Sequence, residues 1–119
     1  ERIEMEIGRF SVLDHDGVVV GCAAFYPLSK KRGEPAAAEL ACLAVMPEYR
    51  RAGYGDQLRR HIETRAKAMK LKRLYVLTTR TAHWFVERGF AEVGLDALPQ
   101  ARRELYNYQR RSKVLVKSL

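Results

Sequence analysis

The glycine-containing segment Arg50-Arg-Ala-Gly-Tyr-Gly55 is the stretch of this 119-residue chain best suited to chemistry. An apolar run at 40–45 precedes it, and an amphipathic helical pattern follows it. Gly53 and Gly55 permit positive φ angles and let backbone N–H groups approach an anion closely. The following helix adds N-terminal donors and the positive end of its dipole. We expect a cradle for the phosphate or pyrophosphate of a cofactor; a turn that binds nothing is the alternative.

The spacing differs from two other phosphate-binding loops. The dinucleotide fingerprint requires G-x-G-x-x-G, and a Walker loop requires Gly-Lys followed by Ser or Thr. The segment contains neither pattern.

Composition narrows the function classes. The net charge is +8, but basic residues are spread along the chain without a nucleic-acid-binding motif, so no nucleic-acid partner is expected. No apolar run approaches the roughly 20 residues of a membrane span, so no membrane partner is expected. The three histidines are scattered, which predicts no metal site. Cys22 and Cys42 lie in apolar runs, which favours buried, reduced thiols in the cytoplasm, with a disulfide as the alternative.

The periodicity of apolar residues predicts alternating strands and helices that would position this loop. A helix end is expected at 1–7, a hairpin turn at 14–17, and a crossover that makes 40–45 and 74–77 parallel. The predicted strands are 10–13, 18–25, 38–45, 74–77, 90–93 and 108–116, and the predicted helices are 55–70, 81–88 and 98–106.

The central predicted helix has one apolar face. Its buried stripe is expected to hold Leu58, Ile62, Ala66 and Met69. The charged residues, Arg59 and Glu63 among them, lie largely off that stripe. The expected fold class is therefore a mixed α/β sheet, with antiparallel N-terminal strands and a parallel βαβ core, in a single domain over 1–119.

This order of elements resembles the GCN5-related N-acetyltransferase (GNAT) superfamily. Its signature Q/R-x-x-G-x-G/A matches Arg50 to Gly55, and its recurring Gly-Phe matches Gly89-Phe90. The resemblance implies the GNAT fold without its usual first strand and helices. Many superfamily members carry a Tyr four residues before that Gly as a general acid. The corresponding residue here is Phe85, which has no proton to give.

A narrower resemblance covers nearly the whole chain. The strings at 39–45, 77–90 and 105–115 resemble the acetyltransferase domain of the bacterial N-acetylglutamate synthase family. It implies direct acetyl transfer from acetyl-CoA to the α-amine of L-glutamate, which opens arginine biosynthesis. We expect a C-terminal fragment of a longer protein, without arginine feedback and with either reduced or no activity alone.

The resemblance also assigns the cofactor site. The pyrophosphate of acetyl-CoA would lie on the loop amides, and the pantetheine arm would pair with strand 43–45 and place the thioester oxygen near a backbone N–H. A bulge would splay this strand from its parallel neighbour. The expected cofactor-binding residues are Leu43, Ala44, Val45, Arg50, Arg51, Gly53, Tyr54, Gly55 and Asp56.

The acceptor site needs a base and a carboxylate clamp. Glu39, acting through a water, is the candidate catalytic base; a surface charge or an ion pair with a nearby Arg is the alternative. The resemblance assigns Arg110 and Ser112 to the glutamate, with help from Lys113. Cys42 is counted with these substrate-binding residues, as a buried neighbour and not as a nucleophile. Thr78, Thr79 and His83 are weak candidates to protonate the leaving thiolate.

Three alternatives remain open at this point. The chain could acetylate another amine, or it could be a non-catalytic module that binds CoA or drives oligomerisation. A basic nucleic-acid binder ranks last. A homodimer is plausible because an uncovered sheet edge favours association.

Overall fold

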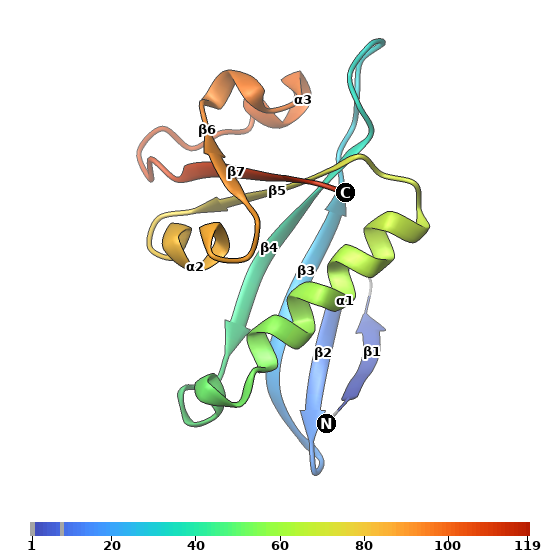
Figure 1. Cartoon of the computed structure of the whole chain (residues 1–119), viewed down its shortest axis with the longest axis vertical. Helices are drawn as coiled ribbons and strands as arrows, with labels where there is room; N and C mark the ends of the chain where they lie inside the picture. The colour runs from blue at the N-terminus through green and yellow to red at the C-terminus, as the bar shows by residue number, and fades with distance from the viewer. Residues whose placement is uncertain (1, 8) are drawn as a thin grey trace. The chain divides into compact units, whose positions relative to one another are not determined.

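A computed structural model describes the backbone of residues 2–7 and 9–119 and the side chains from Arg9 onward. Seven strands, three α-helices and two 3-10 helices follow one another in the described residues (Figure 1). Their order is β1 (Arg2–Ile7), β2 (Phe10–His15), β3 (Val18–Pro27), β4 (Ala37–Val45), η1 (Pro47–Ala52), α1 (Tyr54–Ala68), β5 (Arg73–Thr78), α2 (Ala82–Val86), β6 (Ala91–Val93), η2 (Leu95–Ala97), α3 (Gln100–Arg103) and β7 (Lys113–Ser118).

The chain forms two compact units. Unit 1 comprises the residues up to Tyr26 together with Leu40–Arg65, and unit 2 comprises Pro27–Glu39 together with Ala66–Leu119. Strand β4 therefore contributes its first three residues to unit 2 and the rest to unit 1.

In unit 1 the strands are ordered β1-β2-β3-β4, with β2 antiparallel to both β1 and β3. Helix α1 packs closely against this sheet. A Cβ added at Gly21 of β3 would lie 3.1 Å from both the Ala44 carbonyl oxygen and Leu58 Cδ1. The sheet and helix can approach this closely because position 21 has no side chain. The core here includes Leu13, Val20, Phe25, Leu58 and Ile62.

The predicted hairpin turn is confirmed. His15 pairs with Val18, and the two residues between them, Asp16 and Gly17, have φ angles of 50° and 83°. Positive φ at both central residues is the pattern of a type I′ turn. The Gly17 N–H also donates to Asp14 Oδ2 at 3.1 Å.

The predicted helix end at 1–7 is wrong, because β1 spans Arg2–Ile7. Ile3 and Ile7 suggested a helical spacing. However, Ile3, Met5 and Ile7 also alternate with charged residues, and this period of two fits a strand. Glu1 and Gly8, which belonged to the same prediction, lie outside the described residues.

Helix α1 confirms three of the four predicted buried positions, namely Leu58, Ile62 and Ala66. Met69 is 47% exposed because the helix ends at Ala68, before the stripe reaches it. Arg59 and Glu63 were expected off the buried face but are buried. They can be buried because they form an ion pair of 2.6 Å, which satisfies both charges.

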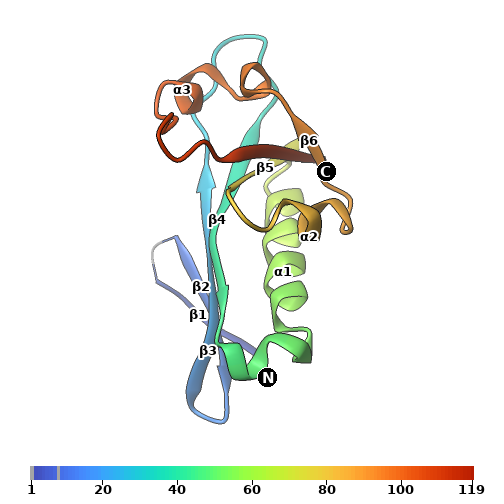
Figure 2. The ribbon, with the colours of Figure 1, turned by 90° about the vertical axis from the view of Figure 1, so that its left-hand side faces the viewer.

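Unit 2 contains the strand order β4-β5-β7-β6, with β7 antiparallel to both β5 and β6 (Figure 2). The four buried residues of one core cluster are Ala37, Tyr75, Leu98 and Val114. Helix α2 is shorter than predicted but is followed by Gly89 at φ 95°, as expected for a residue just beyond a helix end.

The predicted strand at 108–116 begins too early, because β7 starts at Lys113. Asn107 explains the difference: its Oδ1 accepts hydrogen bonds from the backbone N–H groups of Gln109 (2.9 Å) and Arg110 (3.2 Å). A side chain that bonds its own downstream backbone in this way favours a turn over a strand.

Candidate functional site

The predicted phosphate cradle forms a compact turn in unit 1. Residues Pro47–Ala52 form η1, Gly53 has φ 81°, and α1 starts at Tyr54. Arg50 Nε donates to the Val45 carbonyl oxygen at 3.3 Å, which closes the turn after β4. The first hydrogen bond of α1 runs from the Gln57 N–H to the Gly53 carbonyl at 3.0 Å. The backbone N–H groups before Gln57 therefore lie ahead of the first bond within the helix, as at the start of any α-helix.

The two glycines of this loop have different roles. Gly53 occupies the left-handed region, and no atom lies within 4 Å of a Cβ added there, so its conformation and not crowding requires glycine. Gly55 lies inside the first turn of α1, in an ordinary helical position. The 3-10 helix was not predicted from the sequence, although Pro47 at its start is a typical signal for the first turn of a helix.

Internal contacts hold the charged side chains at the start of α1, next to the loop. Asp56, at the start of α1, accepts two hydrogen bonds from the Arg59 guanidinium, both at 3.2 Å. Arg59 also bonds Glu63, so its guanidinium bridges two carboxylates. The Asp56 carboxylate therefore orders the first turn of α1, whereas Arg50 and Arg51 are exposed.

The exposure of the residues in strand β4 changes near Cys42. Ala37 to Leu40 are buried, whereas the positions from Cys42 to Val45 are exposed or half-buried. Cys42 has φ 55°, which breaks the regular pleat and turns its side chain outward. The prediction that Cys22 and Cys42 are buried is therefore wrong: Cys42 is exposed and Cys22 is half-buried. Both are free thiols, and Cys22 Sγ lies 3.9 Å from the Cys42 carbonyl oxygen.

Leu43, Ala44 and Val45, the predicted partners of the pantetheine arm, follow this irregular residue. Leu43 and Val45 are half-buried, and Ala44 is exposed. Strand residues that stay accessible can pair with an amide-containing ligand, so the exposure of these three agrees with the predicted role.

The candidate base Glu39 lies in unit 2 and is buried in an ion pair. Its Oε1 accepts a hydrogen bond from Arg102 Nε at 2.6 Å, and its Oε2 lies 3.5 Å from Arg102 Nη2. The alternative that Glu39 pairs with an arginine is thus the observed state. Arg102 Nη1 is buried and has no hydrogen-bond partner among the described residues.

Sequence reasoning missed Arg102 because it lies 63 residues from Glu39, on the short helix α3. The helical pattern at 98–106 was a signal for an element there. That pattern did not show that the helix contacts the start of strand β4, where Glu39 lies.

The predicted acceptor residues lie in unit 2, just before and at the start of β7. Arg110 is exposed in the turn that Asn107 stabilises. The Ser112 carbonyl accepts a hydrogen bond from the Tyr106 hydroxyl at 2.7 Å, which fixes the approach to β7. Lys113 is exposed, with its Nζ 3.9 Å from Glu92 Oε1. These three residues are brought together by chain proximity, and none is in the core.

Phe85 is buried, and its ring meets the rings of Trp84 and Phe90 edge-on at 4.9 and 5.2 Å. It therefore packs in the core, and its ring has no O–H group that could donate a proton. Among the weak candidates for thiolate protonation, the Thr78 hydroxyl bonds the Thr81 hydroxyl at 2.7 Å, while Thr79 and His83 are exposed.

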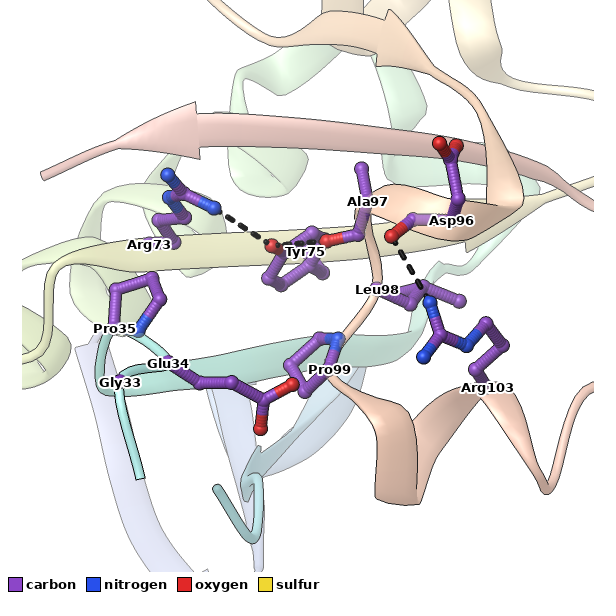
Figure 3. A pocket seen from close by; sticks show the side chains of 10 residues that line it. All are labelled: Gly33, Glu34, Pro35, Arg73, Tyr75, Asp96, Ala97, Leu98, Pro99 and Arg103. Carbon is purple, nitrogen blue, oxygen red and sulfur yellow. Dashed lines mark hydrogen bonds between the residues drawn. The ribbon is translucent and has the colours of Figure 1, made fainter. Parts of the chain in front are cut away.

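Unit 2 also contains a pocket of about 210 Å³ (Figure 3). Loop 33–35, β5, η2 and the first residues after it line this pocket, together with Arg103 of α3. None of the predicted site residues lines it. Glu34 on its wall accepts hydrogen bonds from the backbone N–H groups of Lys31 (2.6 Å) and Gln100 (3.1 Å). These two bonds hold the pKa of the Glu34 carboxyl below its ordinary value.

Glu34, on the wall of this pocket, is therefore connected to the candidate base through helix α3. Glu34 binds the first N–H of α3, and α3 carries Arg102, which grips Glu39. The carboxylate at the start of α3 also interacts favourably with the exposed N–H groups there.

Two classes of site are missing from the part of the chain that is described. No group of three or more His, Cys, Asp or Glu side chains is arranged to hold a metal ion there. Within the same residues, no helix combines the length and the apolar character that a membrane span requires.

Comparison with known proteins gives consistent results. The chain matches the acetyltransferase (GNAT) family over residues 2–91. It is 56% identical over all 119 residues to an amino-acid acetyltransferase of Azotobacter vinelandii and covers 27% of that protein. It is 52% identical over 117 residues, 98% of its length, to the amino-acid acetyltransferase of Ralstonia nicotianae and covers 25% of that protein. The chain thus spans about a quarter of the length of these curated relatives.

The structure of N-acetylglutamate synthase from Neisseria gonorrhoeae, complexed with coenzyme A and N-acetyl-glutamate, matches the chain with a TM-score of 0.82. The sequences are 43% identical, and the match covers 93% of this chain and 26% of that one. The predicted mixed α/β fold is therefore confirmed. A family match over residues 2–91, together with the left-handed Gly53 at the start of α1, shows that the chain belongs to the acetyltransferase (GNAT) family.

Proposed function

We propose that residues 1–119 form a single acetyltransferase domain of a longer amino-acid N-acetyltransferase, which transfers acetyl from acetyl-CoA to the α-amine of L-glutamate. The observation that carries this proposal is the 43% identity to a synthase whose structure contains coenzyme A and N-acetyl-glutamate. In this proposal the protein is cytoplasmic, forms homodimers and supplies N-acetylglutamate to arginine biosynthesis.

The donor side of the reaction uses unit 1. The backbone N–H groups from Gly53 to Asp56 bind the pyrophosphate, because the first turn of a helix presents donors and a positive dipole end to an anion. The exposed guanidiniums of Arg50 and Arg51 add positive charge to this site. The backbone of 43–45 pairs with the pantetheine arm, and one of its N–H groups stabilises the thioester oxygen as negative charge develops on it.

The acceptor side uses groups of unit 2. The pKa of the α-amine is about 8 or above, so most glutamate amine groups are protonated at neutral pH. Glu39 accepts this proton through a water molecule, and Arg102 holds the Glu39 carboxylate in one orientation. The amine nitrogen then attacks the thioester carbon, the C–S bond breaks, the nitrogen of the new amide releases a proton to solvent, and CoA leaves as a thiolate that solvent can protonate.

Arg110, Ser112 and Lys113 bind the carboxylates of glutamate in this proposal. Arg110 is exposed in a turn, so its guanidinium is free to form the paired N–H···O bonds that a carboxylate favours. Cys42, the other residue assigned to the substrate, is an exposed residue of β4 in unit 1.

Calorimetry and a thiol-release assay test the proposal. The chain should bind CoA, and with acetyl-CoA it should release thiol faster with L-glutamate than with other amino acids. Arg110→Ala should raise the KM for glutamate at least about tenfold, which corresponds to a lost charge-assisted carboxylate contact, and leave CoA affinity unchanged. Arg32→Ala, which removes an exposed arginine of unit 2, is the matched control.

Each other outcome identifies a different failure. A chain that does not bind CoA contradicts the donor site. Binding without any thiol release indicates a non-catalytic module, and a preference for another amine contradicts glutamate as acceptor. Equal losses of glutamate use and CoA affinity in Arg110→Ala would refute the role of Arg110.

A further inference from the structure

Three aromatic rings of unit 1 meet beside the phosphate cradle. His15 is the last residue of β2, Tyr49 lies in η1, and Tyr54 is the first residue of α1. The His15 ring centroid lies 5.3 Å from that of Tyr49 and 6.1 Å from that of Tyr54, and the two tyrosine rings stack at 6.0 Å. We call these three residues the His15 cluster. Figures 1 and 2 show the β2–β3 turn and η1 at the same end of this sheet.

A directional hydrogen bond connects two members of the cluster. The Tyr54 hydroxyl lies 3.1 Å from His15 Nδ1, and the Tyr54 side chain is only 7% exposed. On the other side of the imidazole, His15 Nε2 lies 3.5 Å from Asp16 Oδ2. A proton on Nε2 that faces this carboxylate leaves Nδ1 as an acceptor for the Tyr54 hydroxyl.

His15 immediately precedes a tight turn with an internal hydrogen bond. Asp16 and Gly17 both adopt positive φ, and Asp14 Oδ2 accepts the Gly17 N–H. A type I′ turn of this kind matches the twist of its two strands, so it continues the sheet geometry up to His15. The imidazole is therefore held by the hairpin and can order a neighbouring segment.

The segment that it contacts is the phosphate cradle. Tyr49 and Tyr54 flank the four residues 50–53, all of which are exposed. Both flanking rings contact His15, so one imidazole holds both ends of the exposed loop. An anion site binds more tightly when its N–H groups are already in position, because binding then orders less of the chain.

We propose that His15 is a positioning residue for the phosphate-binding loop: through Tyr49 and Tyr54 it holds the backbone N–H groups of the loop ready for the cofactor pyrophosphate. This inference rests on the proposed function, because it assumes that the loop binds CoA. The hairpin of β2 and β3 thereby belongs to the cofactor site, although it is distant from the loop in sequence.

Tyr54→Phe and His15→Phe test the inference, since each keeps an aromatic ring and removes one side of the hydrogen bond. Each variant should weaken CoA binding about fivefold by calorimetry, as expected for the loss of one hydrogen bond. The double variant should bind CoA no more weakly than either single variant. Tyr75→Phe, which removes a phenol that bonds the Ala97 carbonyl at 2.7 Å in unit 2, is the matched control and should bind like the unaltered chain.

Hydrogen exchange of the unliganded chain gives a second readout that does not need the cofactor. Amides 51–56 should exchange faster in both variants, while those of β5 should not change. Unchanged CoA affinity, additive effects in the double variant, or unchanged exchange at 51–56 would each overturn the inference. If the unaltered chain fails to bind CoA, the proposed function fails; loop protection that still depends on His15 would then show that the cluster only stabilises the fold.

Discussion

The ion pair between Glu39 and Arg102 provides the most demanding test of how unit 2 is built. Replacing Arg102 with Met keeps most of the aliphatic stem but leaves the Glu39 carboxylate buried without its cation. The Glu39 side chain is 10% exposed and the Arg102 side chain is 19% exposed, so solvent can replace only part of the lost interaction. Removing one partner of a buried pair costs about 3–5 kcal/mol. Because water reaches the Arg102 side, we expect a loss at or just below the lower limit of that range, about 2–3 kcal/mol of unfolding free energy.

Urea denaturation at pH 7 in a double-mutant cycle measures this energy. Glu39→Gln removes the negative charge and keeps the shape of the side chain. When both changes are combined, no charge is left buried, so the double variant should be more stable than the sum of the single losses predicts, by about 2 kcal/mol. A loss below about 1 kcal/mol for Arg102→Met, or additivity within about 0.5 kcal/mol, would refute the reasoning.

The same variants separate stability from catalysis. If Glu39 is the base, Glu39→Gln should lower kcat by about 10²–10⁴ while leaving the KM for acetyl-CoA nearly unchanged. Arg102→Met should lower kcat less, because the carboxylate is present but poorly oriented. If Glu39→Gln retained kcat within about threefold, the assignment of the base would fail although the stability cycle could still hold.

Three further predictions concern stability. Gly53→Val should cost about 1–2 kcal/mol in thermal unfolding because position 53 has φ 81°, and Gly53→Asn should cost less because Asn tolerates that region; equal losses would contradict this account. Gly21→Val should cost about 1–3 kcal/mol in urea, since its side chain would overlap α1; an unchanged midpoint would show that the helix can shift. The pKa of Glu34 is lowered from its ordinary value of 4.5, so its contribution is complete above that pH and is lost as the pH falls through the folded value. Glu34→Gln should therefore be less stable than the unaltered chain at pH 7 and equally stable in acid, and a gap that persists in acid would refute this.

Local patterns predicted much of the fold. Apolar periodicity identified strands β2 to β5 and helix α1, and Asp16-Gly17 identified the hairpin, because these signals depend on residues close in sequence. The pattern was ambiguous at Arg2–Ile7, where spacings of two and four coincide. It also failed at the start of β7, where the side chain of Asn107 favours a turn.

The strand irregularity at Cys42 shows a different limit. An apolar run of 38–45 predicts a regular central strand, and no residue in it requires positive φ. The φ of 55° at Cys42 costs backbone energy that a local pattern would not predict, so tertiary contacts must compensate for it. Strain of this kind is common at ligand-binding sites, which agrees with the proposed role of the following residues in binding pantetheine.

Sequence patterns could not identify the residues that orient the site, and the reason is the same in each case. Glu39 and Arg102 are 63 positions apart, and His15 and Tyr54 are 39 apart, so only the topology brings each pair together. In both pairs, a predicted site residue is oriented by a partner that the motif does not contain. The R-x-x-G-x-G motif alone therefore predicts a loop suited to a phosphate, and in our proposal its affinity also depends on the hairpin that positions it. Chains with the same motif and a different residue at position 15 should consequently bind CoA with different affinities.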